Sequence, residues 1–333
     1  MSPTGVKDKR PLQEQWQHLH IMTPCLLGKG PGRWRSRPCP STWMTLLPSR
    51  QALKPLIPTF CLLVMVVYGL GEKLRNFVVR IFIPQYHYPY AVALSFGQVL
   101  VSLLFLNLFH LLGLVPLKRY SRPLGEKLLV PAICASIYAV LTMWTKANSA
   151  FSSVTPLTVP MLPLLTVVLS FVLKLSSPPS VHMSILIFIL SVSSVISTVS
   201  KGVSGSHPLE FVYPPLAVIL HSVCLTWLAK VSEAQHRQGG DGPASAFDLY
   251  YVLLVNQFWI LGLLWLVHPH SPWLVLSRGY WQTLLFHGYL LAILLLGMVL
   301  NFMVGMSALC VSPLAAALLY SARDLLQPFV RLL

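Results

Sequence analysis

The chain has 333 residues, of which 55% are hydrophobic and only 10% are charged. About a quarter of the residues of a soluble domain are charged, and no soluble fold of this length buries so much apolar surface, so the composition excludes a soluble globular protein. Lys and Arg number 24 against 9 Asp and Glu, which gives a net charge of +15. In a membrane protein such a balance reflects topology and membrane-surface charge, so we expect a lipid bilayer, and no nucleic acid, as a partner.

The first segment, residues 1–54, is rich in proline, arginine and tryptophan and lacks apolar periodicity. Nine of the basic residues lie in it. We therefore expect a disordered basic cytosolic tail. A mitochondrial presequence is the competing interpretation, because the tail is arginine-rich and poor in acidic residues, but its many prolines disfavour the amphipathic helix that a presequence needs.

Apolar runs long enough to cross a bilayer recur along the rest of the chain. The predicted spans are 55–73, 88–112, 127–147, 154–173, 181–199, 210–230, 247–268, 281–304 and 312–333. The loop between the second and third spans, PLKRYSRPLGEK, is basic, and placing it with the tail on the inside satisfies the positive-inside rule. The pattern predicts an all-α polytopic membrane protein with about nine transmembrane helices and a cytosolic N-terminus.

Two loops in this series resemble each other. Residues 148–157 read NSAFSSVTPL, and residues 306–314 read MSALCVSPL. Five spans separate the two loops, and a repeat offset by an odd number of spans is inverted, as is typical of alternating-access transporters. Residues 55–200 are then the first half-repeat, with helices 1–5, and residues 201–333 are the second, with helices 6–9.

Three further stretches carry a family resemblance: HYPYAVALSFGQ (87–98), VTPLTVPMLPLL (154–165) and SPLAAALLYSARD (312–324). With them the chain, from about residue 56 to its end, resembles the nucleotide-sugar transporters of solute carrier family 35 in the drug/metabolite transporter superfamily. The likeness is closest to the UDP-sugar and GDP-mannose carriers, with a triose-phosphate-translocator character in TVPMLPLLTVVLS. The chain departs from the family pattern at Arg323-Asp324, where the family has Lys-Asn, and at Thr166-Val167, where it has a basic pair.

The resemblance implies an inverted 5+5 repeat of ten helices, of which this chain has nine, so that the second half is truncated. It also implies antiport of a nucleotide sugar, moving from cytosol to lumen, for a nucleoside monophosphate across the Golgi membrane, with the endoplasmic reticulum as the second choice. Three alternatives stay open: a phosphorylated-metabolite (triose-phosphate-like) translocator, a non-transporting regulatory homologue and a truncated isoform. A homodimer is also left open.

The leading candidate for substrate binding is Arg323, because a diphosphate needs guanidinium or ammonium donors. An unpaired charge at the bilayer centre costs about 2.5–3.5 kcal/mol, and adjacent helical residues point about 100° apart, so Asp324 is poorly placed to neutralise it. The other candidates are aromatic, amide and basic residues: Tyr320, Lys146, Asn148, Gln98, Arg80, Tyr250, Tyr251 and Asn256. Each has a structural alternative, as a snorkelling cation, a packed aromatic or an interhelical amide.

Motifs for catalysis are not found. The chain has no His-Glu-x-x-His, Gly-x-Ser-x-Gly or Asp-His-His-Cys sequence, and its six cysteines are scattered without a Cys-x-x-Cys pair. We therefore expect no enzyme activity, no catalytic residues, no cofactor and no metal site.

Overall fold

The structure is a computed structural model that describes residues 56–86, 91–148, 154–175, 178–200, 211–237, 244–268, 272–278 and 280–330. The chain divides into two units, residues 1–54 and residues 55–333. The tail expected over residues 1–54 lies outside the described residues, and every described helix belongs to the second unit.

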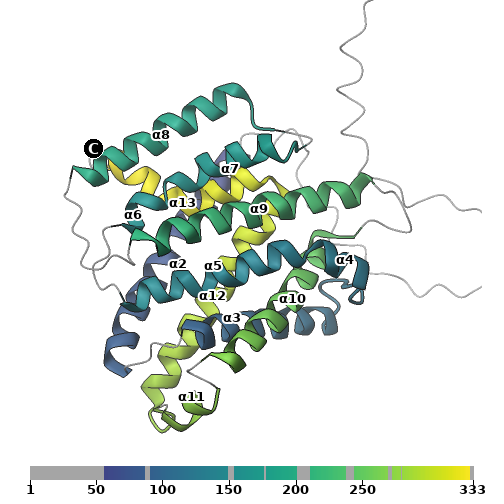
Figure 1. Ribbon diagram of the computed structural model, residues 1–333, viewed down its shortest axis with the longest axis vertical. Coiled ribbons are helices and arrows are strands. Elements are labelled where there is room, and N and C mark those ends of the chain that lie inside the picture. Colours follow the sequence, from purple (N-terminus) through teal and green to yellow (C-terminus); the bar gives the residue numbers. More distant parts are fainter. Residues whose placement is uncertain are drawn as a thin grey trace, which may run out of the picture. The chain divides into compact units, whose positions relative to one another are not determined.

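Helices account for all the regular structure of the described ranges (Figure 1). They are α2 (Leu56–Tyr86), α3 (Ala91–Leu111), α4 (Arg122–Lys127), α5 (Leu129–Asn148), α6 (Thr155–Thr158), α7 (Met161–Val172), α8 (Val181–Val199), α9 (Tyr213–Arg237), α10 (Ala246–Val267), α11 (Pro272–Arg278), α12 (Leu284–Cys310) and α13 (Pro313–Val330). Each predicted span overlaps at least one of these helices. The short helices α4 and α11 were not predicted, because six or seven residues in a loop give no periodic signal.

Five helices are long and apolar enough to cross a membrane: α3, α8, α9, α10 and α12. Shorter apolar stretches lie in α5, α7 and α13. Large hydrophobic side chains are also exposed along these helices, such as Leu104 (60%), Phe188 (54%) and Trp259 (63%). Because a soluble protein does not leave so much apolar surface in water, the prediction of an all-α membrane protein is confirmed. The number of nine spans stays a prediction.

The first helix differs from its predicted span. The predicted span 55–73 ends at Lys73 and so leaves Arg75 and Arg80 in the connection to the next span, whereas α2 continues to Tyr86 and contains all three residues. Lys73 and Arg80 are exposed, but Arg75 is only 5% exposed. The loop assignment of Arg75 was wrong because charged residues also occur within a helix. Their spacing there puts them on different faces, so that Arg75 faces inward while Lys73 and Arg80 face outward.

The fourth predicted span is broken into α6 and α7. Pro156, Pro160 and Pro163 lie in or beside the break, and Pro160 directly precedes the first residue of α7. Each proline removes a backbone donor and clashes with the preceding turn. The spacing of the prolines thus explains why this apolar segment is two short helices.

Interhelical packing follows a regular scheme in which α2 packs on α12 and α5 packs on α9. Further contacts join α3 to both α10 and α12, α5 to α10, and α7 to α13 (Figure 1). A continuous apolar core runs through these contacts and includes Leu128, Leu162, Leu249 and Leu261, all of them fully buried. The core holds together helices that lie far apart in the sequence.

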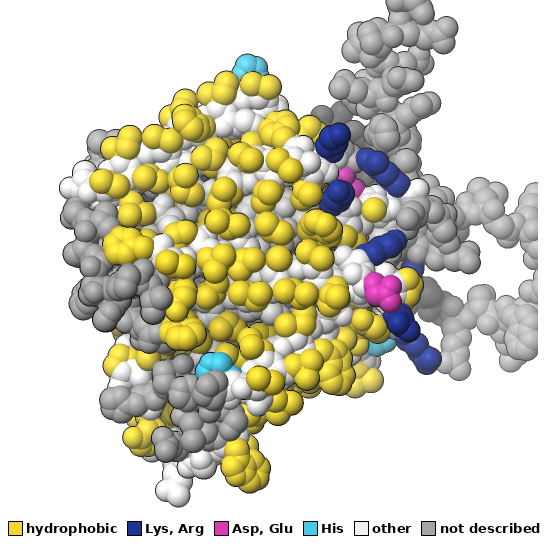
Figure 2. All heavy atoms as spheres, in the orientation of Figure 1, with side chains coloured by type: hydrophobic (Ala, Val, Ile, Leu, Met, Phe, Trp, Pro, Cys, Tyr) yellow, Lys and Arg dark blue, Asp and Glu magenta, His cyan; other side chains and the backbone are white. Residues whose placement is uncertain are grey.

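Charged side chains are unevenly distributed over the surface of the second unit. Figure 2 shows Lys and Arg side chains gathered at one edge of the visible face, over α4 and the neighbouring ends of α9 and α10, while the rest of this face is predominantly apolar. The basic edge includes the ends of helices that the sequence places next to the cytosolic loops.

Candidate functional site

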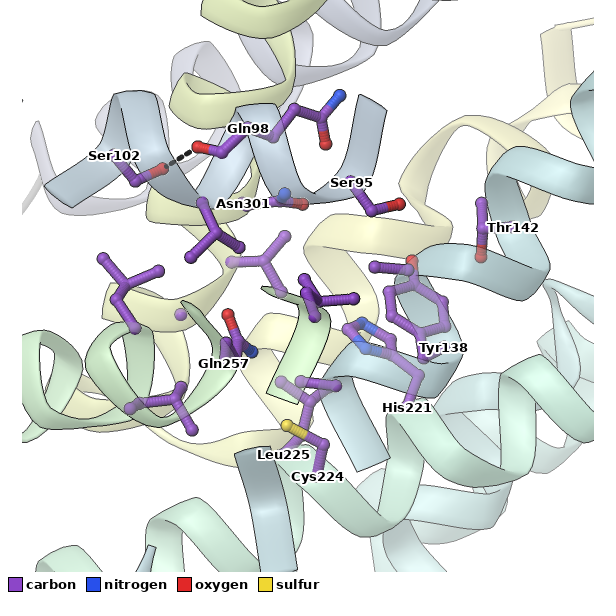
Figure 3. A pocket seen from close by; sticks show the side chains of 18 of the residues that line it. Ser95, Gln98, Ser102, Tyr138, Thr142, His221, Cys224, Leu225, Gln257 and Asn301 are labelled. Carbon is purple, nitrogen blue, oxygen red and sulfur yellow. Dashed lines mark hydrogen bonds between the residues drawn. The ribbon is translucent and has the colours of Figure 1, made fainter. Parts of the chain in front are cut away.

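A cavity of about 90 Å³ lies among seven helices of the second unit. Its walls are formed by α2, α3 and α5 from the first predicted half and by α9, α10, α12 and α13 from the second. In Figure 3, Ser95, Gln98 and Asn301 lie on one side of the cavity, and His221, Cys224 and Gln257 lie on the other. Side chains from both predicted halves of the chain therefore line the same cavity.

Arg75 supplies the fixed positive charge of the cavity wall. The residue is 5% exposed, and its Nε atom is buried without a hydrogen-bond partner. No carboxylate of the described residues forms an ion pair with it; Glu72, three residues earlier on α2, is partly buried but lies beyond salt-bridge distance. The charges of Glu72 and Arg75 both act on Tyr138, but no described carboxylate contacts the guanidinium, which is therefore a candidate for binding an anion.

His221 lines the same cavity as Arg75 and contacts two tyrosine rings. Its imidazole stacks on the ring of Tyr138 (Figure 3), with centroids 4.1 Å apart and an interplanar angle of 18°. It also contacts the ring of Tyr320, with centroids 4.9 Å apart. Tyr138 and Tyr320 also meet edge to face at 6.2 Å. Both ring nitrogens of His221 are buried without a hydrogen-bond partner in the described part of the chain. The faces of the imidazole are thus covered, while its polar edge is available.

The amide of Gln98 is held on α12. Its Nε2 donates to the backbone carbonyl of Ile293 at 3.3 Å. The hydroxyl of Ser102, one turn later, donates to the backbone carbonyl of Gln98 at 2.8 Å. Gly297 of α12 makes this approach possible, because a Cβ atom at that position would overlap the Gln98 amide. Ser95, one turn before Gln98, has a buried hydroxyl without a hydrogen-bond partner among the described residues.

Tyr250 closes the cavity from α10. Its ring packs edge-on against Phe302 at 5.5 Å, and Gly305 gives it room, since a Cβ there would lie 2.6 Å from the tyrosine ring. Hydroxyl and amide groups of Thr142, Gln257 and Asn301 complete the polar lining. The arrangement offers one guanidinium together with several neutral donors and acceptors.

The sequence-predicted residues divide into three groups. Gln98, Tyr250 and Tyr320 line the cavity together. Arg80 is exposed on α2, and Tyr251 packs on the apolar core; neither lines the cavity. The side chains of Lys146, Asn148 and Arg323, and that of Asp324, lie outside the described part of the structure, and their roles stay predictions.

Asn256 has a different position. Its Nδ2 donates to the carbonyl of Gly125 at 2.8 Å, and its Oδ1 accepts from the hydroxyl of Tyr120 at 3.0 Å. Eight residues earlier on α10, Asp248 accepts from the backbone N–H of Lys118 at 2.8 Å. These three contacts join α10 to the segment that contains α4, and we call them the α4–α10 clamp.

Arg75, Tyr138 and His221 were missed by sequence reasoning. Arg75 was assigned to a loop because the charges around it ended the apolar run. The spacing of the charged residues is the signal that could have identified it. If the helix continues past Lys73, Arg75 lies on the same face as Glu72, three residues earlier, and on nearly the opposite face from Lys73. His221 lies in the middle of a predicted span, where a polar side chain usually faces the protein interior.

A comparison with protein-family models and with curated proteins finds no match to this chain. The described residues also contain no cluster of three His, Cys, Asp or Glu side chains able to hold a metal ion. The structure shows a cavity that contains one buried guanidinium and several neutral polar groups inside a helical membrane protein.

Proposed function

We propose that this protein is a secondary-active transporter that exchanges a nucleotide sugar for a nucleoside monophosphate across a Golgi or endoplasmic reticulum membrane. The observation that carries the proposal is Arg75, a buried guanidinium that no described carboxylate contacts, in a cavity lined by both halves of the chain. A fixed charge that is costly to bury is retained at a membrane-protein interior where it serves a solute.

The chemistry of the cavity suits a phosphate-bearing solute. A guanidinium binds phosphate oxygens through charge-assisted and often bidentate hydrogen bonds. Sugar hydroxyls need both donors and acceptors, which Ser95, Thr142, Gln257 and Asn301 supply. Anionic and hydroxyl-rich groups are the two parts that a nucleotide sugar combines.

The packing of the helices supports the inverted repeat that such a transporter needs. In an inverted repeat, α2, α3, α5 and α7 of the first half correspond in that order to α9, α10, α12 and α13 of the second. Replacing each helix by its counterpart turns the α2–α12 contact into the α9–α5 contact. The contact of α3 with α12 likewise becomes that of α10 with α5, while α3–α10 and α7–α13 map onto themselves. All these contacts are present; the α12–α13 contact, by contrast, has no comparable counterpart between α5 and α7 in the described residues.

The orientation in the proposal rests on charge. Positively charged loops stay on the cytosolic side of a membrane. The basic edge in Figure 2 includes α4, which follows the loop that we expect in the cytosol. The proposal therefore has the α4 end of the molecule facing the cytosol and the α11 end facing the lumen.

The test is exchange by purified protein in liposomes loaded with uridine, guanosine or cytidine monophosphate and supplied with labelled nucleotide sugars. We expect one nucleotide sugar to enter in exchange for its matching monophosphate. Arg75→Gln should lower the exchange rate about tenfold or more, because it removes a charge-assisted contact. Arg80→Gln is the matched control, since it removes an exposed charge five residues further along the same helix.

The same assay separates the alternatives. Exchange of 3-phosphoglycerate or triose phosphate, without exchange of any nucleotide sugar, would replace the proposal by a phosphorylated-metabolite translocator that uses the same guanidinium. Absence of exchange with every solute, by protein that remains folded, would favour a non-transporting homologue. Equal activity of the Arg75→Gln and Arg80→Gln proteins would refute the role of Arg75.

A further inference from the structure

His221 has an environment that a purely structural histidine does not need. Its two ring nitrogens lie at the cavity without hydrogen-bond partners in the described part of the chain, and the residue is 7% exposed. A buried polar group that is left unpaired costs about 1–3 kcal/mol, so its position calls for a partner that arrives later. The partner cannot be a stacked ring, because Tyr138 and Tyr320 already contact the imidazole.

Charge balance suggests what the partner is. The diphosphate of a nucleotide sugar carries two negative charges, and Arg75 is the one cation among the described residues that line the cavity. A dianion beside a single guanidinium leaves one negative charge uncompensated in a low-dielectric interior. A protonated imidazole would supply the second positive charge and would also turn both of its ring nitrogens into donors.

We propose that His221 takes up one proton from water when the cavity binds a phosphate-bearing anion, so that anion binding is coupled to protonation. This inference rests on the proposed function and adds to it the means by which the site compensates a dianion. Without the anion, burial disfavours the charged imidazole; with the anion in place, the opposite charge favours it.

The titratable and charged groups around His221 are consistent with this coupling. Tyr138 faces it from α5 and Tyr320 from α13, and Tyr250 of α10 and Cys224 of its own helix share the cavity wall. From α2, Arg75 lines the same cavity, and Glu72 carries a charge that acts on both Tyr138 and Tyr320. The bound anion brings a negative charge into the cavity, and that charge favours the protonated imidazole.

The coupling is measured by titration calorimetry of the whole purified protein with UDP-glucose, GDP-mannose and CMP-sialic acid as probes. The phosphates of these compounds do not titrate near neutral pH, so any proton taken up belongs to the protein. We expect the binding enthalpy to vary with the ionisation enthalpy of the buffer by about one proton, and the binding constant to fall by up to tenfold per pH unit as pH rises, which is the linkage slope for one proton.

His221→Gln keeps hydrogen-bonding groups but cannot be protonated, so its binding should lose the proton uptake and the pH dependence. His287→Gln, an exposed histidine at the start of α12, is the control and should retain both. Binding without proton uptake by the wild-type protein, or uptake that survives in His221→Gln, would overturn the inference and leave the proposed function standing. Failure of every probe to bind between pH 5.5 and 8.5 would overturn the proposed function and the inference together.

Discussion

At the scale of single residues, the cavity depends on two glycines of α12, because a side chain at either position would collide with a residue that lines the cavity. Gly297 and Gly305 are eight residues apart on that helix, and the first leaves room for the amide of Gln98 while the second leaves room for the ring of Tyr250. Gln98 and Tyr250 were both predicted from sequence as substrate-binding residues. The glycines that seat them could not be predicted, because their importance lies in a close approach between helices distant in sequence.

Gly297→Ala should therefore disturb the site, because its Cβ would overlap the Gln98 amide and displace it from the Ile293 carbonyl. Overpacking of this kind costs about 1–3 kcal/mol of stability. Thermal unfolding in detergent should show a lower midpoint for Gly297→Ala, and calorimetry should show weaker binding of the nucleotide sugar. Gly288→Ala on the same helix meets no neighbouring atom and is the control. Equal behaviour of the two variants would contradict the assignment.

At the scale of elements, the α4–α10 clamp shows why a polar residue in a predicted span is ambiguous. Asn256 lies near the middle of α10 and was predicted as a ligand contact, yet its amide bonds Gly125 and Tyr120 of the α4 segment. Polar groups in membrane helices bind either a solute or another segment of the protein. Both roles use the same residue type, and only the position of α4, a helix of six residues, distinguishes them.

The clamp predicts a structural effect for Asn256→Ala. The change leaves the buried Gly125 carbonyl and the Tyr120 hydroxyl without their partner, at a cost of about 1–3 kcal/mol. We expect a lower unfolding midpoint, with affinity for the nucleotide sugar changed less than by Arg75→Gln. Asn107→Ala is the control, because Asn107 is exposed and donates only to Leu103 of its own helix. A large loss of affinity without a loss of stability would restore Asn256 to the binding site.

At the scale of the whole molecule, the sequence predicted the helical membrane protein and the positions of its main helices, because runs of apolar residues report burial in lipid directly. It did not predict Arg75 or His221. A charged side chain near the end of an apolar run is typical of a loop, and a single histidine in a span is typical of helix packing. Only the packing of α2, α5, α9 and α13 around one space brings these groups together.

Orientation is the remaining property of the whole molecule that the charge distribution predicts. The α4 end carries the basic residues and should face the cytosol, and the start of α12 should face the lumen. In a cysteine-free background, Arg119→Cys before α4 and Gln282→Cys before α12 place single exposed thiols at the two predicted ends.

In sealed, right-side-out organelle vesicles, a membrane-impermeant maleimide should label Arg119→Cys at once and Gln282→Cys only after the membrane is permeabilised. Labelling of both without permeabilisation would mean that the two positions share a side, which the odd number of predicted spans between them cannot produce. The reverse pattern would invert the molecule and make the basic edge lumenal. Because the cavity is lined from both halves, its proposed role in exchange would survive such an inversion, but the proposed direction in which each solute enters it would not.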